Sequence, residues 1–103
     1  MPLRPGQNPQ PLPREGAELL GLQALGWVAA RPALVGRFLS AAGASAEEMR
    51  ARAADPEFLG FVLDFLLADE EALLAFASET GVAPDRPLRA RAALPGGVLP
   101  HWT

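Results

Sequence analysis

The sequence contains no cysteine, lysine, isoleucine or tyrosine, and it has a single histidine. Without cysteine the chain can form neither disulfides nor thiolate metal sites, and it has no cysteine nucleophile. The missing isoleucine and tyrosine, set against abundant alanine and leucine, favour helix over sheet. All nine basic residues are arginine. A GC-rich coding bias is a sufficient reason for this, so we do not interpret it as phosphate recognition.

The sequence also lacks any apolar run long enough to cross a bilayer, and its start lacks the apolar core of a signal peptide. The longest run, residues 58–67 (FLGFVLDFLL), is interrupted only by Gly60 and Asp64. At helical spacing these two residues share one narrow strip with Glu57, and apolar side chains occupy the rest of the circumference. We therefore expect a central helix covered on most sides, in a soluble cytoplasmic protein that makes no membrane contact.

Charge is unevenly distributed along the chain, although the formal net charge is only -3. Residues 55–85 contain eight acidic side chains and no basic one, whereas Arg86, Arg89 and Arg91 follow without any acid. An acidic middle segment repels nucleic acid. We do not expect nucleic-acid binding, and a weak contact through these three arginines ranks third among the functional alternatives.

Helical periodicity and its start and stop signals predict an all-α fold, a compact bundle of about six short helices. Pro32 and Pro56 suit first helical turns, Ser45 and Glu48 form a capping box, and Gly43 and Gly81 end helices. The predicted helices span about 17–29, 32–42, 46–53, 55–68, 70–80 and 88–94. They form a single helical domain over 15–97, preceded by a flexible, proline-rich arm (1–14) and followed by a tail (98–103).

An internal duplication is predicted from a shift of 38 residues, which aligns Phe38 with Phe76 and Gly43 with Gly81. After one inserted residue, the string RARAA at 50–54 recurs at 89–93. We expect two three-helix units, about 17–54 and 56–94, that share one core through the Trp27 helix and the Phe58 helix. The hypothesis requires the two backbones to superpose helix for helix.

Several short strings resemble a family of short bacterial proteins, domain of unknown function 3572 (DUF3572). They are LQALGW at 22–27, DPEFL at 55–59, VLDFL at 62–66, LPGG at 94–97 and the pair His101-Trp102. The resemblance covers about residues 17–103 and leaves the proline-rich arm outside. Because these motifs consist mainly of packing residues, the resemblance implies a compact helical domain and transfers neither catalytic residues nor a ligand.

Five residues stand out as candidates for interaction or tail docking: Trp27, Asp64, Phe65, His101 and Trp102. For Trp27 the main interpretation is core packing with its N–H bonded to a carbonyl or water, and the alternative is ligand stacking. Asp64 either marks the solvent strip of the central helix or is buried, and burial would make that helix the first place to look for function. Trp102 docks on its own bundle, contacts a partner or is disordered, and we favour docking.

No catalytic constellation is present, because the sequence offers no nucleophile with a base, no metal set and no evident carboxylate pair. We therefore expect neither an enzyme nor a cofactor. The leading hypothesis is a non-catalytic helical module that binds a protein partner, with homodimerisation as its simplest version and the acidic segment steering a basic partner. The alternative is a small-molecule or lipid-binding bundle with a pocket between the two units, near Trp27, Phe58 and Phe65.

Overall fold

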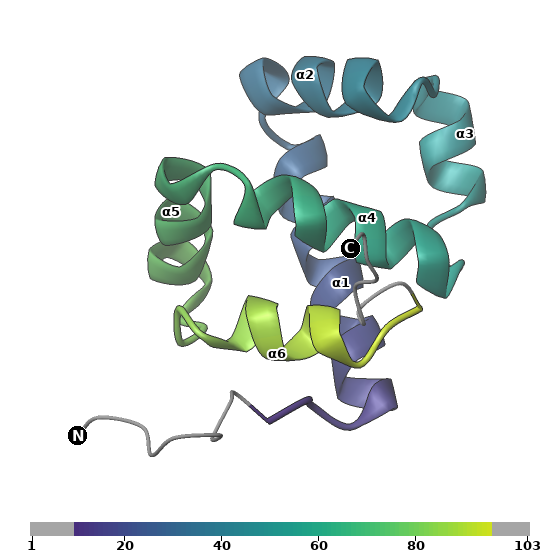
Figure 1. Cartoon of the computed structure of the whole chain (residues 1–103). Coiled ribbons are helices and arrows are strands. Elements are labelled where there is room, and N and C mark those ends of the chain that lie inside the picture. The colour runs from purple at the N-terminus through teal and green to yellow at the C-terminus, as the bar shows by residue number, and fades with distance from the viewer. Residues whose placement is uncertain (1–9, 96–103) are drawn as a thin grey trace, which may run out of the picture.

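The computed structural model describes residues 10–95, which form six helices and no strand (Figure 1). The predicted all-α bundle is confirmed. Its helices are α1 (Arg14–Ala29), α2 (Pro32–Ala42), α3 (Ala46–Ala51), α4 (Pro56–Leu67), α5 (Glu70–Thr80) and α6 (Arg86–Ala92).

Local capping chemistry explains where most of these helices begin and end. Ser45 and Glu48 form the predicted capping box at α3, and the Asp55 carboxylate accepts the Glu57 N–H at the start of α4. Gly43 and Gly81 end α2 and α5 at φ 64° and 76°, a left-handed conformation that favours glycine.

Asp69 caps α5 by accepting the Ala72 N–H at 3.2 Å. This hydrogen bond, followed by the Arg37 guanidinium at 3.0 Å, lowers the pKa of Asp69 below its ordinary value. The contribution of this cap to stability is therefore complete above the ordinary carboxylate pKa and is lost as the pH falls through the lowered value.

Helix α4 lies across α1 in the middle of the molecule (Figure 1), and α6 packs against both. Helices α2 and α5 cover α1 and α4 respectively. The predicted central helix is therefore α4, with Val62, Leu63 and Leu66 inaccessible to solvent. Complete burial of such side chains contributes roughly 1.5–3 kcal/mol each.

The two central helices approach most closely at Gly21 and Leu59. A Cβ atom built on Gly21 would lie 2.9 Å from the Leu59 Cβ, a distance that side chains essentially never adopt. The absent side chain at Gly21 therefore permits the crossing of α1 over α4, at some cost in helix propensity.

The boundary of the proline-rich arm differs from the expectation. We expected a flexible arm through Arg14, but α1 begins at Arg14 and Leu12 is only 5% exposed. The Leu12 N–H donates to the Arg89 carbonyl at 3.1 Å, and Arg89 Nε donates to the Gln10 carbonyl at 2.8 Å. Since the flanking prolines have no N–H, Leu12 supplies the donor that holds this segment on α6. Residues 1–9 lie outside the described residues.

Reciprocal contacts between the units agree with the predicted duplication. Trp27 of α1 packs edge-on against Phe76 of α5, with ring centroids 5.6 Å apart at 78°. The shift of 38 residues converts this pair into Phe65 and Phe38, which also pack edge-on, at 5.3 Å and 80°. Gly21 likewise meets Leu59, the residue 38 positions later. Such exchanged contacts are expected of two units related by a pseudo-twofold axis. The duplication stays a prediction that superposition of the units tests.

The two units differ in their third helices. Helix α6 packs extensively against α1 and α4, whereas α3 has no extensive packing partner among the helices of residues 10–95. Within α3 only Met49 is buried. The first unit therefore leaves part of α1 and α4 uncovered, at the place where the second unit is closed.

Two glycine substitutions in α1 test the close crossing. Gly21→Ala should destabilise the fold by about 1–3 kcal/mol because its methyl group cannot fit against Leu59. Gly26→Ala meets no atom within 4 Å and should stabilise the same helix by roughly 0.5–1 kcal/mol. Denaturant unfolding measures both, and equal effects of the two substitutions would contradict the crossing.

Candidate interaction surface

An apolar depression lies between α1 and the start of α4, beside the turn that follows α3. We name it the leucine groove. It has a volume of about 270 Å³. Leu19 and Leu22 line it while 64% and 46% exposed, which is unusual for leucines one turn apart. Its lining residues are Glu15, Glu18, Leu19, Leu22, Ala53, Ala54 and Leu59.

The groove is open because the two units close their third helices differently. Leu22 corresponds to Gly60 under the shift of 38 residues, and Gly60 is buried. A Cβ atom on Gly60 would lie 2.9 Å from Arg91 Nη1 and 3.2 Å from the Pro95 carbonyl oxygen. In the second unit the chain end of α6 thus covers α4, whereas α3 is six residues long and leaves Leu22 exposed.

Two acids form the rim of the groove along α1. Glu15 is exposed, and Glu18 accepts from Arg14 Nε at 3.0 Å in a solvent-exposed pair. Exposed pairs of this kind contribute little to stability. Acids beside an apolar floor favour an incoming segment that carries both apolar and basic groups.

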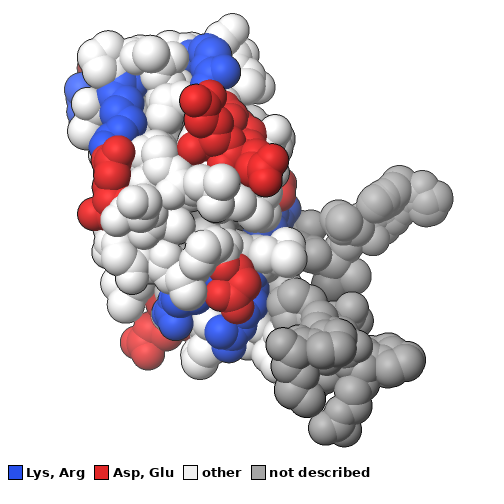
Figure 2. Space-filling view, turned by 90° about the vertical axis from the view of Figure 1, so that its left-hand side faces the viewer, with Lys and Arg blue, Asp and Glu red and all other residues white. Residues whose placement is uncertain are grey.

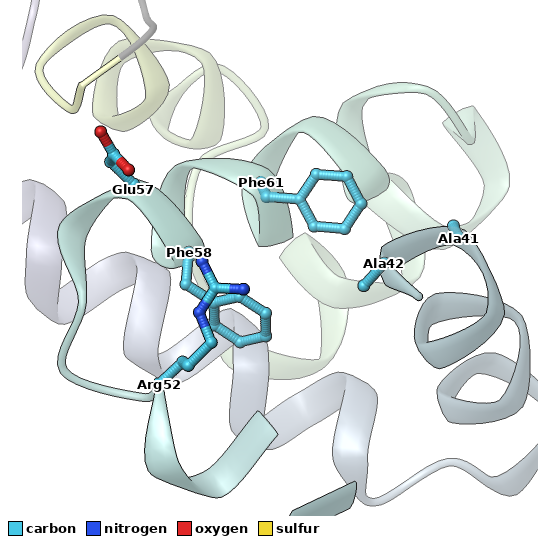
Figure 3. Close-up of a pocket in the computed structure, with 6 residues that line it drawn as sticks. All are labelled: Ala41, Ala42, Arg52, Glu57, Phe58 and Phe61. Carbon is cyan, nitrogen blue, oxygen red and sulfur yellow. The ribbon is translucent and has the colours of Figure 1, made fainter. Parts of the chain in front are cut away.

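A second depression, the Arg52 hollow, lies on the other side of α3 and measures about 300 Å³ (Figure 3). The Arg52 guanidinium lies over the Phe58 ring, 4.8 Å from its centroid, and pairs with Asp55 at 3.5 Å. The Phe61 ring points towards the end of α2 at Ala42 (Figure 3). Since Phe58 is only 2% exposed, Phe61 supplies most of the aromatic surface that a ligand could contact.

Trp27 is a core residue with an unforeseen polar partner. It is 9% exposed, and its Nε1–H donates to Glu79 Oε1 at 3.0 Å instead of to a carbonyl or water. Arg31 stacks on the indole at 3.9 Å and also pairs with Glu79. Together they join α1 to α5 beside a shallow hollow of about 220 Å³. Sequence spacing could not reveal this cluster, because Trp27 and Glu79 are 52 positions apart.

Asp64 is half exposed and pairs with Arg91 of α6. Arg91 Nε and Nη2 donate to its two carboxylate oxygens at 2.7 and 3.0 Å. The guanidinium is only 13% exposed, and its Nη1 also donates to the Pro95 carbonyl at 2.9 Å. The polar strip expected on α4 is therefore solvated at Asp64, but α6 covers it at Gly60.

The other candidate residues are not brought to a common site. Phe65 is partly buried and packs on Phe38, on a different part of the molecule from Trp27 and its partner Phe76. His101 and Trp102 lie outside the described residues. The five candidates therefore divide into packing residues, one ion pair and a tail segment.

Charges of opposite sign meet across the surface. The face in Figure 2 carries acidic and basic side chains beside one another, with uncharged surface between them. Arg37 of α2 pairs with Asp69 at 3.0 Å, so part of the acidic middle segment is neutralised by the first unit. Net charge along the sequence thus overstates the negative field of α5.

Residues 10–95 contain no group of three His, Asp or Glu side chains placed to hold a metal ion. In the same range no single helix has the length and apolar composition needed to span a bilayer. Helices α1 and α2 reach these together, but they meet at a bend of 116°.

Removal of the Asp64 carboxylate should destabilise the fold. Asp64→Asn leaves the largely buried Arg91 guanidinium without an anionic acceptor, and we expect a loss of about 1–2 kcal/mol. Glu18→Gln, in the exposed Arg14 pair, should cost less than about 0.5 kcal/mol. Thermal or denaturant unfolding measures both, and equal losses would show that the Arg91 pair is an ordinary surface contact.

Comparison with known proteins agrees with the resemblance in the sequence. The family described as "Protein of unknown function (DUF3572)" matches residues 14–97, from the first residue of α1 to the glycines after α6. Neither the curated proteins nor the solved structures contain a match to the chain. Since the family match covers most of the sequence, the chain belongs to the DUF3572 family.

Proposed function

We propose that this protein is a non-catalytic interaction module that binds a protein partner through the leucine groove. The observation that carries the proposal is the pair of exposed leucines, Leu19 and Leu22, beside a depression with Leu59 in its floor. Adjacent exposed leucines in a hollow mark sites of protein association more often than scattered apolar residues do.

The groove suits an amphipathic helix or extended segment with apolar side chains and basic flanks. Helix-in-groove recognition uses apolar anchors of this kind, and Glu15 and Glu18 provide the complementary charge. Face-to-face homodimerisation would bring two acidic rims together. The groove therefore favours a basic partner over a second copy, although self-association is the simpler version to test.

A non-catalytic role is supported by the uses of the acids in residues 10–95. Asp55 and Asp69 cap helices, while Asp64 and Glu79 pair with arginines. These contacts give each carboxylate a structural reason to be where it is.

The second candidate function is small-molecule or lipid binding, which the Arg52 hollow favours. A ligand with an apolar chain and a carboxylate could contact Phe61 and pair with Arg52, whose side chain is 49% exposed. Titration with a medium-chain fatty acid should then shift backbone signals at Ala41, Ala42 and Phe61. Titration without shifts there would remove this candidate.

Leu19→Glu should abolish partner binding, because it places a charge in the apolar floor of the groove. Leu74→Glu is the matched control, since Leu74 is 49% exposed on α5 and does not line the groove. The measurement compares the proteins retained from a cell extract by the wild type and by the two variants. Analytical ultracentrifugation of the same three proteins tests the homodimeric version.

Retention by the wild type and the Leu74→Glu variant, together with loss in the Leu19→Glu variant, is the expected result. Addition of salt should weaken it, because the acidic rim is solvent-exposed. Identical sets of proteins on all three baits would contradict the proposal.

A further inference from the structure

We propose that the segment Val98–Trp102 of the same chain docks in the leucine groove. The inference does not depend on the proposed function, because it requires only the groove and the segment that follows α6. If both hold, the docked segment competes with the partner and the groove becomes available only when the segment leaves.

The described chain stops beside the groove. The Pro95 carbonyl lies against Gly60, held by the Arg91 guanidinium at 2.9 Å, and Gly60 is adjacent to Leu59 in the groove floor. Eight residues follow Pro95 in the sequence. Fully extended, they span at most about 26–29 Å, which is ample to reach from Gly60 to Leu19 and Leu22 along the adjoining helix.

The same molecule already holds one extended segment in this manner. Leu12 stands between two prolines and is buried on α6, where its N–H bonds to the Arg89 carbonyl and the Arg89 side chain holds Gln10. Arg89 is the first residue of the second RARAA string. The first RARAA string, residues 50–54, contributes Ala53 and Ala54 to the leucine groove. The groove therefore lies beside a copy of the sequence that anchors the N-terminal segment.

The composition of the tail matches the groove. Val98, Leu99 and Trp102 are apolar, and Pro100 follows leucine as Pro13 follows Leu12. His101 is the only basic side chain after Arg91, and it would approach the acidic rim of Glu15 and Glu18. A segment tethered at Pro95 also has a high effective concentration, which favours it over a second copy of the chain.

Methyl NMR spectra of the full chain and its Trp102→Ala variant test the inference directly. The indole ring current should displace the methyl signals of Leu19, Leu22 and Leu59, and these displacements should disappear in the variant. Leu74, which is similarly exposed on α5, is the internal control and should not change. Trp27 is retained in both proteins, so its own ring current cancels in the comparison.

Stability provides a second readout. Trp102→Ala and Leu22→Ala should each lower the melting temperature, and the double variant should lose less than the sum, because both remove the same contact. Leu74→Ala should be additive with Trp102→Ala. Truncation after Gly97 should reproduce the effect of Trp102→Ala.

Three outcomes would overturn the inference. The first is an unchanged set of groove methyl signals in the Trp102→Ala variant. The second is displacement confined to the Arg52 hollow, which would place the tail elsewhere. The third is a groove effect that grows with protein concentration and accompanies a dimer in sedimentation, which would make a second copy the occupant. None of these outcomes decides the proposed function, which fails separately if the Leu19→Glu variant retains the partner.

Discussion

The close crossing of α1 over α4 at Gly21 and Leu59 is the constraint on which the rest of the fold depends. Because the absent side chain lets the two longest helices approach, Leu63, Leu66 and Val28 become inaccessible to solvent around the crossing. The other helices then pack against this pair. Since a domain of this size has one modest core, few other contacts could replace the crossing.

The crossing also organises the relation between the two units. Gly21 and Leu59 occupy corresponding positions, and the edge-on aromatic pairs Trp27–Phe76 and Phe38–Phe65 exchange partners on either side of it. Each unit thus supplies one aromatic residue from its first helix and one from its second. The arrangement resembles a dimer interface within one chain, although α3 and α6 depart from it and leave the leucine groove on one side.

Much of the helical architecture could be predicted from the sequence, because it is determined locally. Pro32, Ser45, Gly43 and Gly81 act on their own turns, and they place helix ends without knowledge of the tertiary structure. The burial of α4 followed from its lack of polar side chains. The central position of Phe58 was likewise predictable, since apolar side chains surround it in the sequence.

The remaining features depend on contacts between distant residues. Leu12 appeared to belong to a flexible arm, and only the carbonyl of Arg89 explains its burial. Leu19 and Leu22 widened the apolar face of α1 in the sequence, yet they line an open groove because α3 ends too early to cover them. The interaction surface thus arises from the absence of a packing partner, which periodicity within one helix cannot reveal.

The central claim is that α3, unlike its counterpart α6, is weakly attached and leaves the groove open. Hydrogen exchange measured residue by residue on the full chain tests this claim most directly, because exchange reports local opening. The account predicts that amides of Ala46–Ala51 exchange much faster than those of Arg86–Ala92. Equal protection of the two helices, or stronger protection of α3, would contradict it.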